Sequence, residues 1–186
     1  MSKQILVLKS SPRENGNSNA LADQLVGGAK EMGADVECLS IHDMNIQPCD
    51  ACDVCQETGV CIVKDDMQKV YPLLEKADAI VLASPIYWFT INAQAKAVID
   101  RFYALETEQG NSLGGKEIGI ILTYGDTDLH NSGGINAIRT LEDTFRYIGA
   151  EIVGIVHGTA DGVGDAEKDP ELMKRAFKLG QKLAEA

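Results

Sequence analysis

The chain has 186 residues, with 28 acidic against 17 basic side chains and a formal net charge of −11. This length suits one domain with a full hydrophobic core, and the acidic surface repels phosphate backbones, which argues against nucleic acid as a partner. No apolar run approaches the ~20 residues that span a bilayer, and the first residues lead directly into a strand pattern. We therefore expect neither a membrane segment nor a signal peptide.

Short apolar runs alternate with helical patterns along the chain, which predicts a parallel sheet covered on both faces. Five strands are expected, near residues 5–8, 35–41, 79–83, 118–122 and 152–156. Helices with one apolar face are expected at 21–32, 67–77, 95–105 and 135–148, and a last one begins at Asp169-Pro170. Pro72 predicts a kink or a delayed start in the second helix. Cys38, in an alternating stretch, is expected to be a buried thiol.

These five strand–helix units predict one α/β domain over residues 1–186. The expected fold is a flavodoxin-like doubly wound parallel sheet of five strands in the order 2-1-3-4-5, with helices on both faces. In such sheets ligands bind outside the carboxyl ends of the strands. The loops at those ends are therefore the candidate site.

The first of these loops runs from Ser10 to Asn19 and combines hydroxyls, amides, a glycine and one arginine just before a helix. Backbone N–H groups and the helix dipole make such a position a favourable anion site. The loop lacks the G-x-G-x-x-G spacing of a dinucleotide site, so a phosphomonoester suits it better than a pyrophosphate. A polar turn with a capping serine is the alternative.

Aromatic residues follow the third strand, in the loop from Ser84 to Asn92. Three consecutive aromatics at a strand end can sandwich a flat ring, although aromatic clusters are also common in cores. The loop over residues 123–134, after the fourth strand, offers backbone donors and polar side chains to the edge of such a ring.

The densest chemical signal is a cysteine-rich loop at residues 47–64, which carries Cys49, Cys52, Cys55 and Cys61. Five cysteines with this clustering fit a reducing cytoplasm better than a disulfide framework. Thiolates so close in sequence can surround one metal centre, and soft sulfur ligands select iron–sulfur clusters or zinc. Zinc is less favoured because structural zinc sites commonly split their ligands into two separated pairs. Free thiols remain a third possibility.

Several of these motifs together resemble a known family. Ser11-Pro12-Arg13 with Gly16-Asn17-Ser18, then Ser84-Pro85-Ile86-Tyr87, then Gln94-Ala95-Lys96 leading to Asp100-Arg101, resemble the NAD(P)H-dependent FMN reductase group of flavodoxin-like proteins. With the four cysteines followed by Asp65-Asp66-Met67, the chain resembles an iron–sulfur flavoprotein.

The resemblance implies an FMN site and a metal site. The FMN phosphate would lie against Ser11, Arg13, Asn17, Ser18 and Asn19, with Ser10 standing where many relatives have glycine. Pro85, Ile86, Tyr87 and Trp88 would hold one edge and face of the isoalloxazine, and Thr123, Tyr124, Gly125 and Asp126 the other. The resemblance further implies a [4Fe-4S] cluster on Cys49, Cys52, Cys55 and Cys61, and a homodimer or homotetramer whose neighbouring subunit completes the flavin face.

The sequence therefore predicts a cytoplasmic FMN-dependent oxidoreductase that moves electrons between NAD(P)H or a ferredoxin-type donor and a small-molecule acceptor. A cluster-free NAD(P)H-dependent FMN or quinone reductase is the first alternative. A flavodoxin-type electron carrier and a zinc-binding or redox-sensing module are the others. No residue is predicted as a general acid or base.

Overall fold

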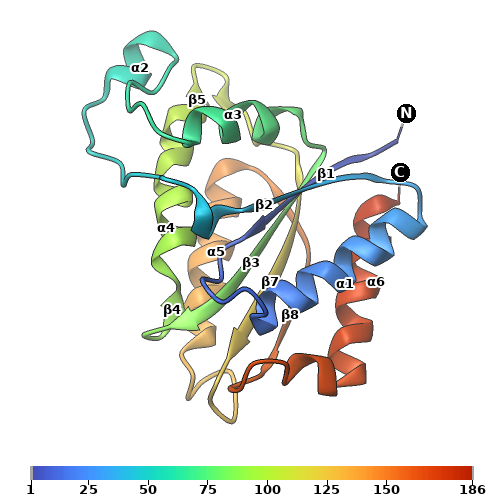
Figure 1. The fold of residues 1–186 in the computed structure, drawn as a ribbon. Helices are drawn as coiled ribbons and strands as arrows, with labels where there is room; N and C mark the ends of the chain where they lie inside the picture. The colour runs from blue at the N-terminus through green and yellow to red at the C-terminus, as the bar shows by residue number, and fades with distance from the viewer. Residues whose placement is uncertain (1, 186) are drawn as a thin grey trace.

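The predicted apolar runs form a central sheet in the order β2-β1-β3-β7-β8, and every neighbouring pair in it is parallel. The computed structural model describes residues 2–185. The strands are β1 (Gln4–Lys9), β2 (Asp35–Ser40), β3 (Ala79–Tyr87), β7 (Glu117–Tyr124) and β8 (Glu151–Thr159). Figure 1 shows this sheet edge-on between two layers of helices. The predicted flavodoxin-like fold and strand order are confirmed.

Two short hairpins were not predicted. The two-residue strand β4 (Thr90–Ile91) folds back antiparallel on the end of β3, so β3 runs four residues beyond its predicted end. The strands β5 (Glu106–Thr107) and β6 (Gly110–Asn111) form a separate small hairpin.

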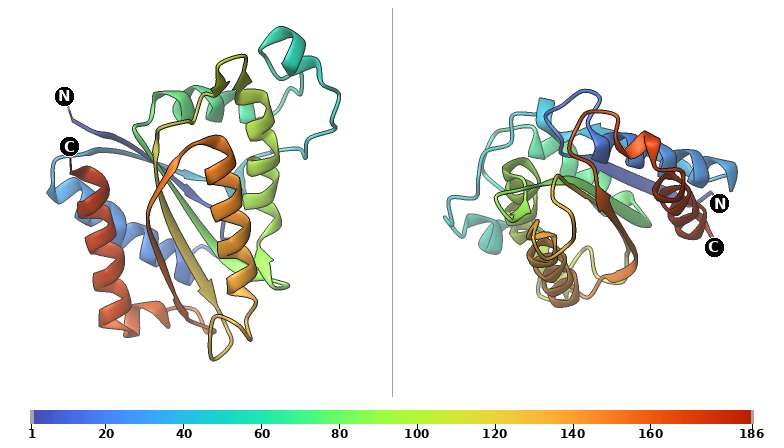
Figure 2. Two further views of the ribbon diagram at one scale, coloured as in Figure 1. Left: turned by 180° about the vertical axis from the view of Figure 1, so that it is seen from behind. Right: turned by 90° about the horizontal axis from the view of Figure 1, so that it is seen from below.

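Successive side chains of each strand point to opposite faces of the sheet, so the hydrophobic core is divided into two parts, one on each face. Ile5 and Val7 of β1 pack with α1 (Asn17–Glu31) and α6 (Pro170–Ala184). Leu6 and Leu8 point the other way. There they meet α3 (Met67–Lys76), α4 (Ala93–Asp100) and α5 (Gly134–Ile148), and the views in Figure 2 show the same two layers. The shorter helices are η1 (Ile41–Asp43), α2 (Val54–Thr58), η2 (Arg101–Leu105) and η3 (Ala166–Lys168). Within residues 2–185 none of the helices is both long and apolar enough to cross a membrane.

Two expectations about single residues need correction. α3 begins at Met67 with Pro72 inside it, so the delayed start is wrong. Pro72 is exposed, where water can satisfy the carbonyl that its missing N–H leaves free. Cys38 is exposed rather than buried, because β2 is an edge strand with only β1 beside it.

The cysteine-rich loop is attached to this framework by a buried ion pair. Arg101 and Asp65 each have side chains only 1% exposed, and Nη1 of the arginine lies 2.6 Å from Oδ2 of the carboxylate. Asp65 also accepts hydrogen bonds from the backbone N–H groups of Gln47 (2.8 Å) and Met67 (3.0 Å). One carboxylate therefore joins the start of the loop to the start of α3.

We expect Asp65→Ala to destabilise the protein by about 3–5 kcal/mol, because the Arg101 cation would remain buried without its partner. Urea unfolding of the two proteins measures the difference. Asp143→Ala is the matched control, since Asp143 pairs with Arg139 and Arg146 at the surface and such pairs contribute about 0–1 kcal/mol. Equal losses in the two variants would contradict the prediction.

The pKa of Asp65 makes the free energy of unfolding depend on pH. Burial alone would raise the pKa of Asp65, but hydrogen bonds from Arg101 and from two backbone amides outweigh it and hold this pKa below the ordinary 3.8. A depressed pKa contributes stability that is complete above the unfolded pKa and is lost as pH falls through the folded pKa. The unfolding free energies of wild type and Asp65→Asn should differ by a constant amount from about pH 7 to pH 5 and converge below about pH 4. Divergence on acidification, measured by denaturant titration, would refute this.

Candidate functional site

The strands β1, β3, β7 and β8 end at the lower side of the sheet in Figure 1. The residues at these ends line a hollow. It is bordered by the loops that the sequence singled out. The predicted residues that line it are Ser11, Arg13, Asn17, Ser18, Pro85, Ile86, Tyr87, Thr123, Tyr124 and Gly125. A second hollow shares Ile86, Tyr124 and Gly125 with the first and adds the predicted Trp88 and Asp126. Because they share these three residues, the two hollows adjoin each other at the strand ends, and we call them together the slot.

At one end of the slot, a tight turn presents unpaired donors. The N–H of Gly16 bonds to the carbonyl of Arg13 (2.9 Å), and α1 starts at the next residue without a side-chain cap. The backbone N–H groups of Asn17 and Ser18 make no hydrogen bond within residues 2–185, as expected for a first helical turn. The hydroxyl of Ser18 is also buried without a partner and can donate; Oδ1 of Asn19 is buried and unpaired as well, but it is an acceptor and adds nothing to an anion site. This turn fits an anion with several acceptor oxygens, such as a phosphate.

Gly16 gives this turn its shape. A Cβ atom at that position would lie 2.3 Å from Oγ of Ser11 and 3.0 Å from the carbonyl oxygen of Arg13. Oγ of Ser11 in turn accepts a hydrogen bond from the N–H of Arg13 (3.2 Å). Any side chain at Gly16 would therefore open the turn.

Three predicted site residues use their side chains elsewhere. The Asn17 amide donates to the carbonyls of Ala160 (3.0 Å) and Gly162 (2.8 Å), so it ties α1 to the loop after β8 and offers only its backbone N–H to the slot. Ser10 is fully buried beneath the slot and donates to the carbonyl of Ala83 (2.9 Å). The Asn19 amide donates to the carbonyl of Arg13 (3.1 Å) and holds the turn from behind.

The aromatic loop forms a strained hairpin at the other end of the slot. Trp88 and Phe89 occupy the two central turn positions with φ values of 49° and 69°, both in the left-handed region. This backbone normally favours Asn-Gly, and each such residue costs on the order of 1–3 kcal/mol. Asn136 donates to the carbonyl of Phe89 (3.3 Å), while the Trp88 side chain is 92% exposed at the mouth of the slot. The turn thus holds a large aromatic ring in water beside the slot.

Sequence reasoning missed several residues of the slot. Asp161 and Ala160 line it from the end of β8, and the same rule that pointed to the other strand ends could have found them. Asp161 lies so close to Gly125 that a Cβ atom there would be 2.7 Å from Oδ1. Gly16, Phe89, Asn131 and Ser132 also line the slot; sequence reasoning placed them in the candidate loops but gave them no individual role.

Asn92 also supports the slot, although sequence reasoning assigned it no role. Its amide donates to the carbonyl of Ser10 (2.6 Å), and its Oδ1 accepts from the hydroxyl of Ser84 and the N–H of Ala95, each at 3.2 Å. Asn92 therefore caps α4 while it joins the tips of β1 and β3.

A tyrosine–histidine pair lies beside the slot. The Tyr124 hydroxyl lies 3.0 Å from Nδ1 of His157. Burial raises the pKa of Tyr124 and lowers the pKa of His157. Both side chains are therefore neutral at pH 7.

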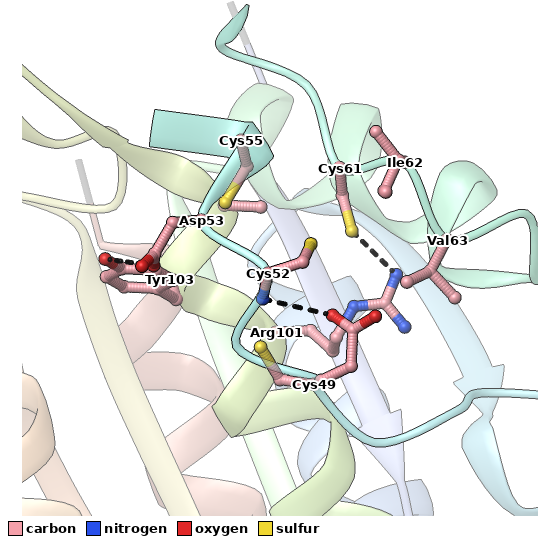
Figure 3. A pocket seen from close by; sticks show the side chains of 11 residues that line it. Cys49, Cys52, Asp53, Cys55, Cys61, Ile62, Val63, Arg101 and Tyr103 are labelled. Atoms are coloured by element: carbon pink, nitrogen blue, oxygen red, sulfur yellow. Dashed lines mark hydrogen bonds between the residues drawn. The ribbon is translucent and has the colours of Figure 1, made fainter. Parts of the chain in front are cut away.

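The four clustered cysteines line one pocket, at the far end of α4 from the slot (Figure 3). Arg101 and Tyr103 complete its floor, and Nη2 of Arg101 lies 3.3 Å from Sγ of Cys61. All the cysteines are free thiols. No group of three or more histidine, cysteine or acidic side chains within residues 2–185 is spaced to hold a metal ion. The donor chemistry thus matches the prediction for this loop, while the sulfur positions do not form a closed ligand set.

The two sites share α4. Asn92 at its start supports the slot, and Arg101, directly after its last residue, contacts the cysteine pocket. A helix of eight residues is about 12 Å long. The slot and the pocket are therefore held at opposite ends of one short rigid element.

Comparison with known proteins agrees with these observations. A family model described as NADPH-dependent FMN reductase matches residues 4–161. An iron–sulfur flavoprotein of Methanocaldococcus jannaschii is 30% identical, over 98% of this chain and 96% of that protein. An iron–sulfur flavoprotein of Archaeoglobus fulgidus is 32% identical, over 95% of this chain and 76% of that protein.

Among solved structures, an NAD(P)H:quinone oxidoreductase from Methanothermobacter marburgensis has a TM-score of 0.78 at 17% identity, over 100% of this chain and 99% of that one. This likeness supports the fold. The sequence matches establish the family, as predicted: the chain belongs to the NADPH-dependent FMN reductases, a family of flavin-dependent oxidoreductases.

Proposed function

We propose that the protein moves electrons between NAD(P)H or a ferredoxin-type carrier and a small acceptor, using FMN in the slot and a [4Fe-4S] cluster on Cys49, Cys52, Cys55 and Cys61. The observation that carries the flavin assignment is the turn before α1, where free backbone N–H groups and the buried, unpaired hydroxyl of Ser18 border the slot. The cluster assignment is supported by four thiols in one pocket and by relatives named iron–sulfur flavoproteins.

The phosphate of FMN would lie against the N–H groups of Asn17 and Ser18 and the hydroxyls of Ser11 and Ser18. Arg13 is exposed at the edge of this turn, where a cation attracts the phosphate without being buried. Asn17 and Asn19 hold the turn in shape. Ser10 supports it from below.

The isoalloxazine would lie along the rest of the slot. Pro85, Ile86 and Tyr87 border it on one side, and Thr123, Tyr124, Gly125 and Asp126 on the other. FMN supplies hydride and single-electron chemistry when bound. The chain's own contribution is to orient the ring, to limit water around it and to direct backbone groups at its edge.

The mouth of the slot is the proposed position for donor and acceptor. Trp88 and Phe89 border it with apolar surface, which suits a planar molecule stacked on the flavin. Tyr87, Trp88 and Phe89 are three neighbouring aromatic residues that are all exposed, and contiguous apolar surface of this kind is typical of an interaction site. This surface therefore also supports the homodimer or homotetramer, in which a neighbouring subunit covers this hairpin.

A cluster-free NAD(P)H-dependent FMN or quinone reductase is the second candidate. The observation that favours it is the open arrangement of the sulfur atoms within the described residues. Iron and sulfide analysis separates the two candidates.

We expect Gly16→Ala to raise the dissociation constant of FMN about tenfold or more, because the added Cβ atom would open the phosphate turn. Fluorescence titration of the flavin-free protein measures this. Gly27→Ala, in the helix α1 that follows this turn, is the control: its Cβ atom would meet only the Phe177 ring at an ordinary 3.7 Å.

Unchanged FMN affinity in Gly16→Ala would overturn the phosphate site. The flavin of wild-type protein should also bleach when NADPH is added without oxygen. If it bleaches only with a separate reductase, the protein is an electron carrier of the flavodoxin type.

For the metal site, protein purified without oxygen should contain about four iron and four sulfide ions per chain. Cys55→Ser should lose most of both while it keeps FMN. Cys38→Ser is the matched control, since Cys38 is an exposed thiol on β2 and should leave the iron content unchanged. If the wild-type protein binds FMN but contains no iron, the cluster assignment is wrong and the cluster-free reductase is the remaining candidate. Stoichiometric zinc would indicate a zinc site.

A further inference from the structure

We propose that Arg101 is the positioning residue of the cysteine pocket: it holds both ends of the cysteine-rich loop against the core and places a positive charge beside the sulfur of Cys61. The electrostatic half of this inference rests on the cluster proposed above. The attachment of the loop to the core does not depend on it.

The guanidinium of Arg101 uses every N–H that it has. Nε donates to the hydroxyl of Tyr71 (3.2 Å), and Nη1 donates to Asp65 (2.6 Å) and to the carbonyl of Gln47 (2.9 Å). Nη2 donates to Asp65 (3.3 Å) and to Sγ of Cys61 (3.3 Å). An arginine has five such donors, so none is left over for water or another partner.

Partners of Arg101 lie at both ends of the cysteine-rich loop. Gln47 begins the loop, whereas Cys61 and Asp65 end it, so a single side chain rooted at the end of α4 closes the loop. Between Gln47 and Val63 the only helix is the five-residue α2, which stands apart from the sheet in Figure 1.

Other contacts also hold the loop: Gln56 donates to the carbonyl of Tyr103 (2.8 Å), and the Tyr103 hydroxyl donates to Asp53 (3.1 Å). Gln68 of α3 donates to the carbonyls of Cys61 (3.1 Å) and Val63 (2.9 Å). These contacts reach the middle or the end of the loop, whereas Arg101 contacts both ends.

A purely structural ion pair would explain the bonds to Asp65, but not the contact with sulfur. Asp65 alone neutralises the charge of Arg101, and the fifth N–H could have gone to a carbonyl. Instead it faces Cys61, a predicted cluster ligand, at the edge of the pocket in Figure 3. A cation and an N–H donor beside sulfur ligands favour the reduced, more negative state of a cluster.

The attachment to the core is tested on cluster-free protein by cleavage with a lysine-specific protease at Lys64, an exposed residue between Cys61 and Asp65. We expect Arg101→Met to be cut at Lys64 at least tenfold faster than wild type, because the segment opens more often. Arg101→Lys, which keeps the charge but not the planar fork, should lie between them. Arg139→Met, at an exposed pair on α5, should behave as wild type.

The folded state of each variant is checked by its FMN content and circular dichroism, and Arg101→Lys serves if Arg101→Met does not fold. Cleavage at the wild-type rate in folded Arg101 variants would overturn the attachment role.

The electrostatic half is tested by reconstitution with iron and sulfide, followed by spectroelectrochemical titration. The cluster potential should shift downward in Arg101→Lys and further in Arg101→Met, whereas Arg139→Met should not shift it. Unchanged potentials at equal iron content would overturn this half. If wild-type protein takes up no iron, the proposed cluster is wrong, and so is the electrostatic role of Arg101. Cleavage at Lys64 still tests the attachment role.

Discussion

A buried guanidinium is the constraint on which the irregular part of this protein depends. The helices and strands are held by apolar faces packed on both sides of the sheet, but of the cysteine-rich loop over residues 47–64 only Cys55 is buried. Arg101 and Asp65 replace that missing core with a fully desolvated ion pair whose remaining donors and acceptors are all satisfied. Such a pair is stable only as a complete set, because either member alone would be a buried charge.

The slot proposed for the flavin depends on a different constraint, the close approach of backbone to ligand. A parallel sheet brings the ends of β1, β3 and β7 to one edge, and Asn92 joins two of these ends with one amide. In the proposed phosphate site, the helix dipole of α1 and its free N–H groups would supply most of the attraction for the anion. For this reason the slot needs glycine at Gly16 more than it needs any particular charged side chain.

Sequence reasoning predicted the framework because buried parallel strands are continuous apolar runs and their helices have clear apolar faces. It also placed the slot, since ligands of this fold lie at strand ends. It could not predict how side chains are used. Asn17 bonds to groups more than 140 residues away, and Trp88 and Phe89 adopt a turn that their residue types disfavour. Cys38 was misjudged because an alternating pattern does not reveal which strand lies at the edge.

One consequence concerns α4. Its first turn is fixed by Asn92 at the slot, and the residue after its last turn is Arg101 at the pocket. Inserting or deleting one residue between them would rotate one end by about 100° relative to the other, and the guanidinium would then miss Asp65 and Cys61. The contacts of Asn92 and Arg101 thus fix the number of residues in α4. A substitution on the exposed side of α4 would keep both of these contacts, whereas a change in the number of its residues would break one of them.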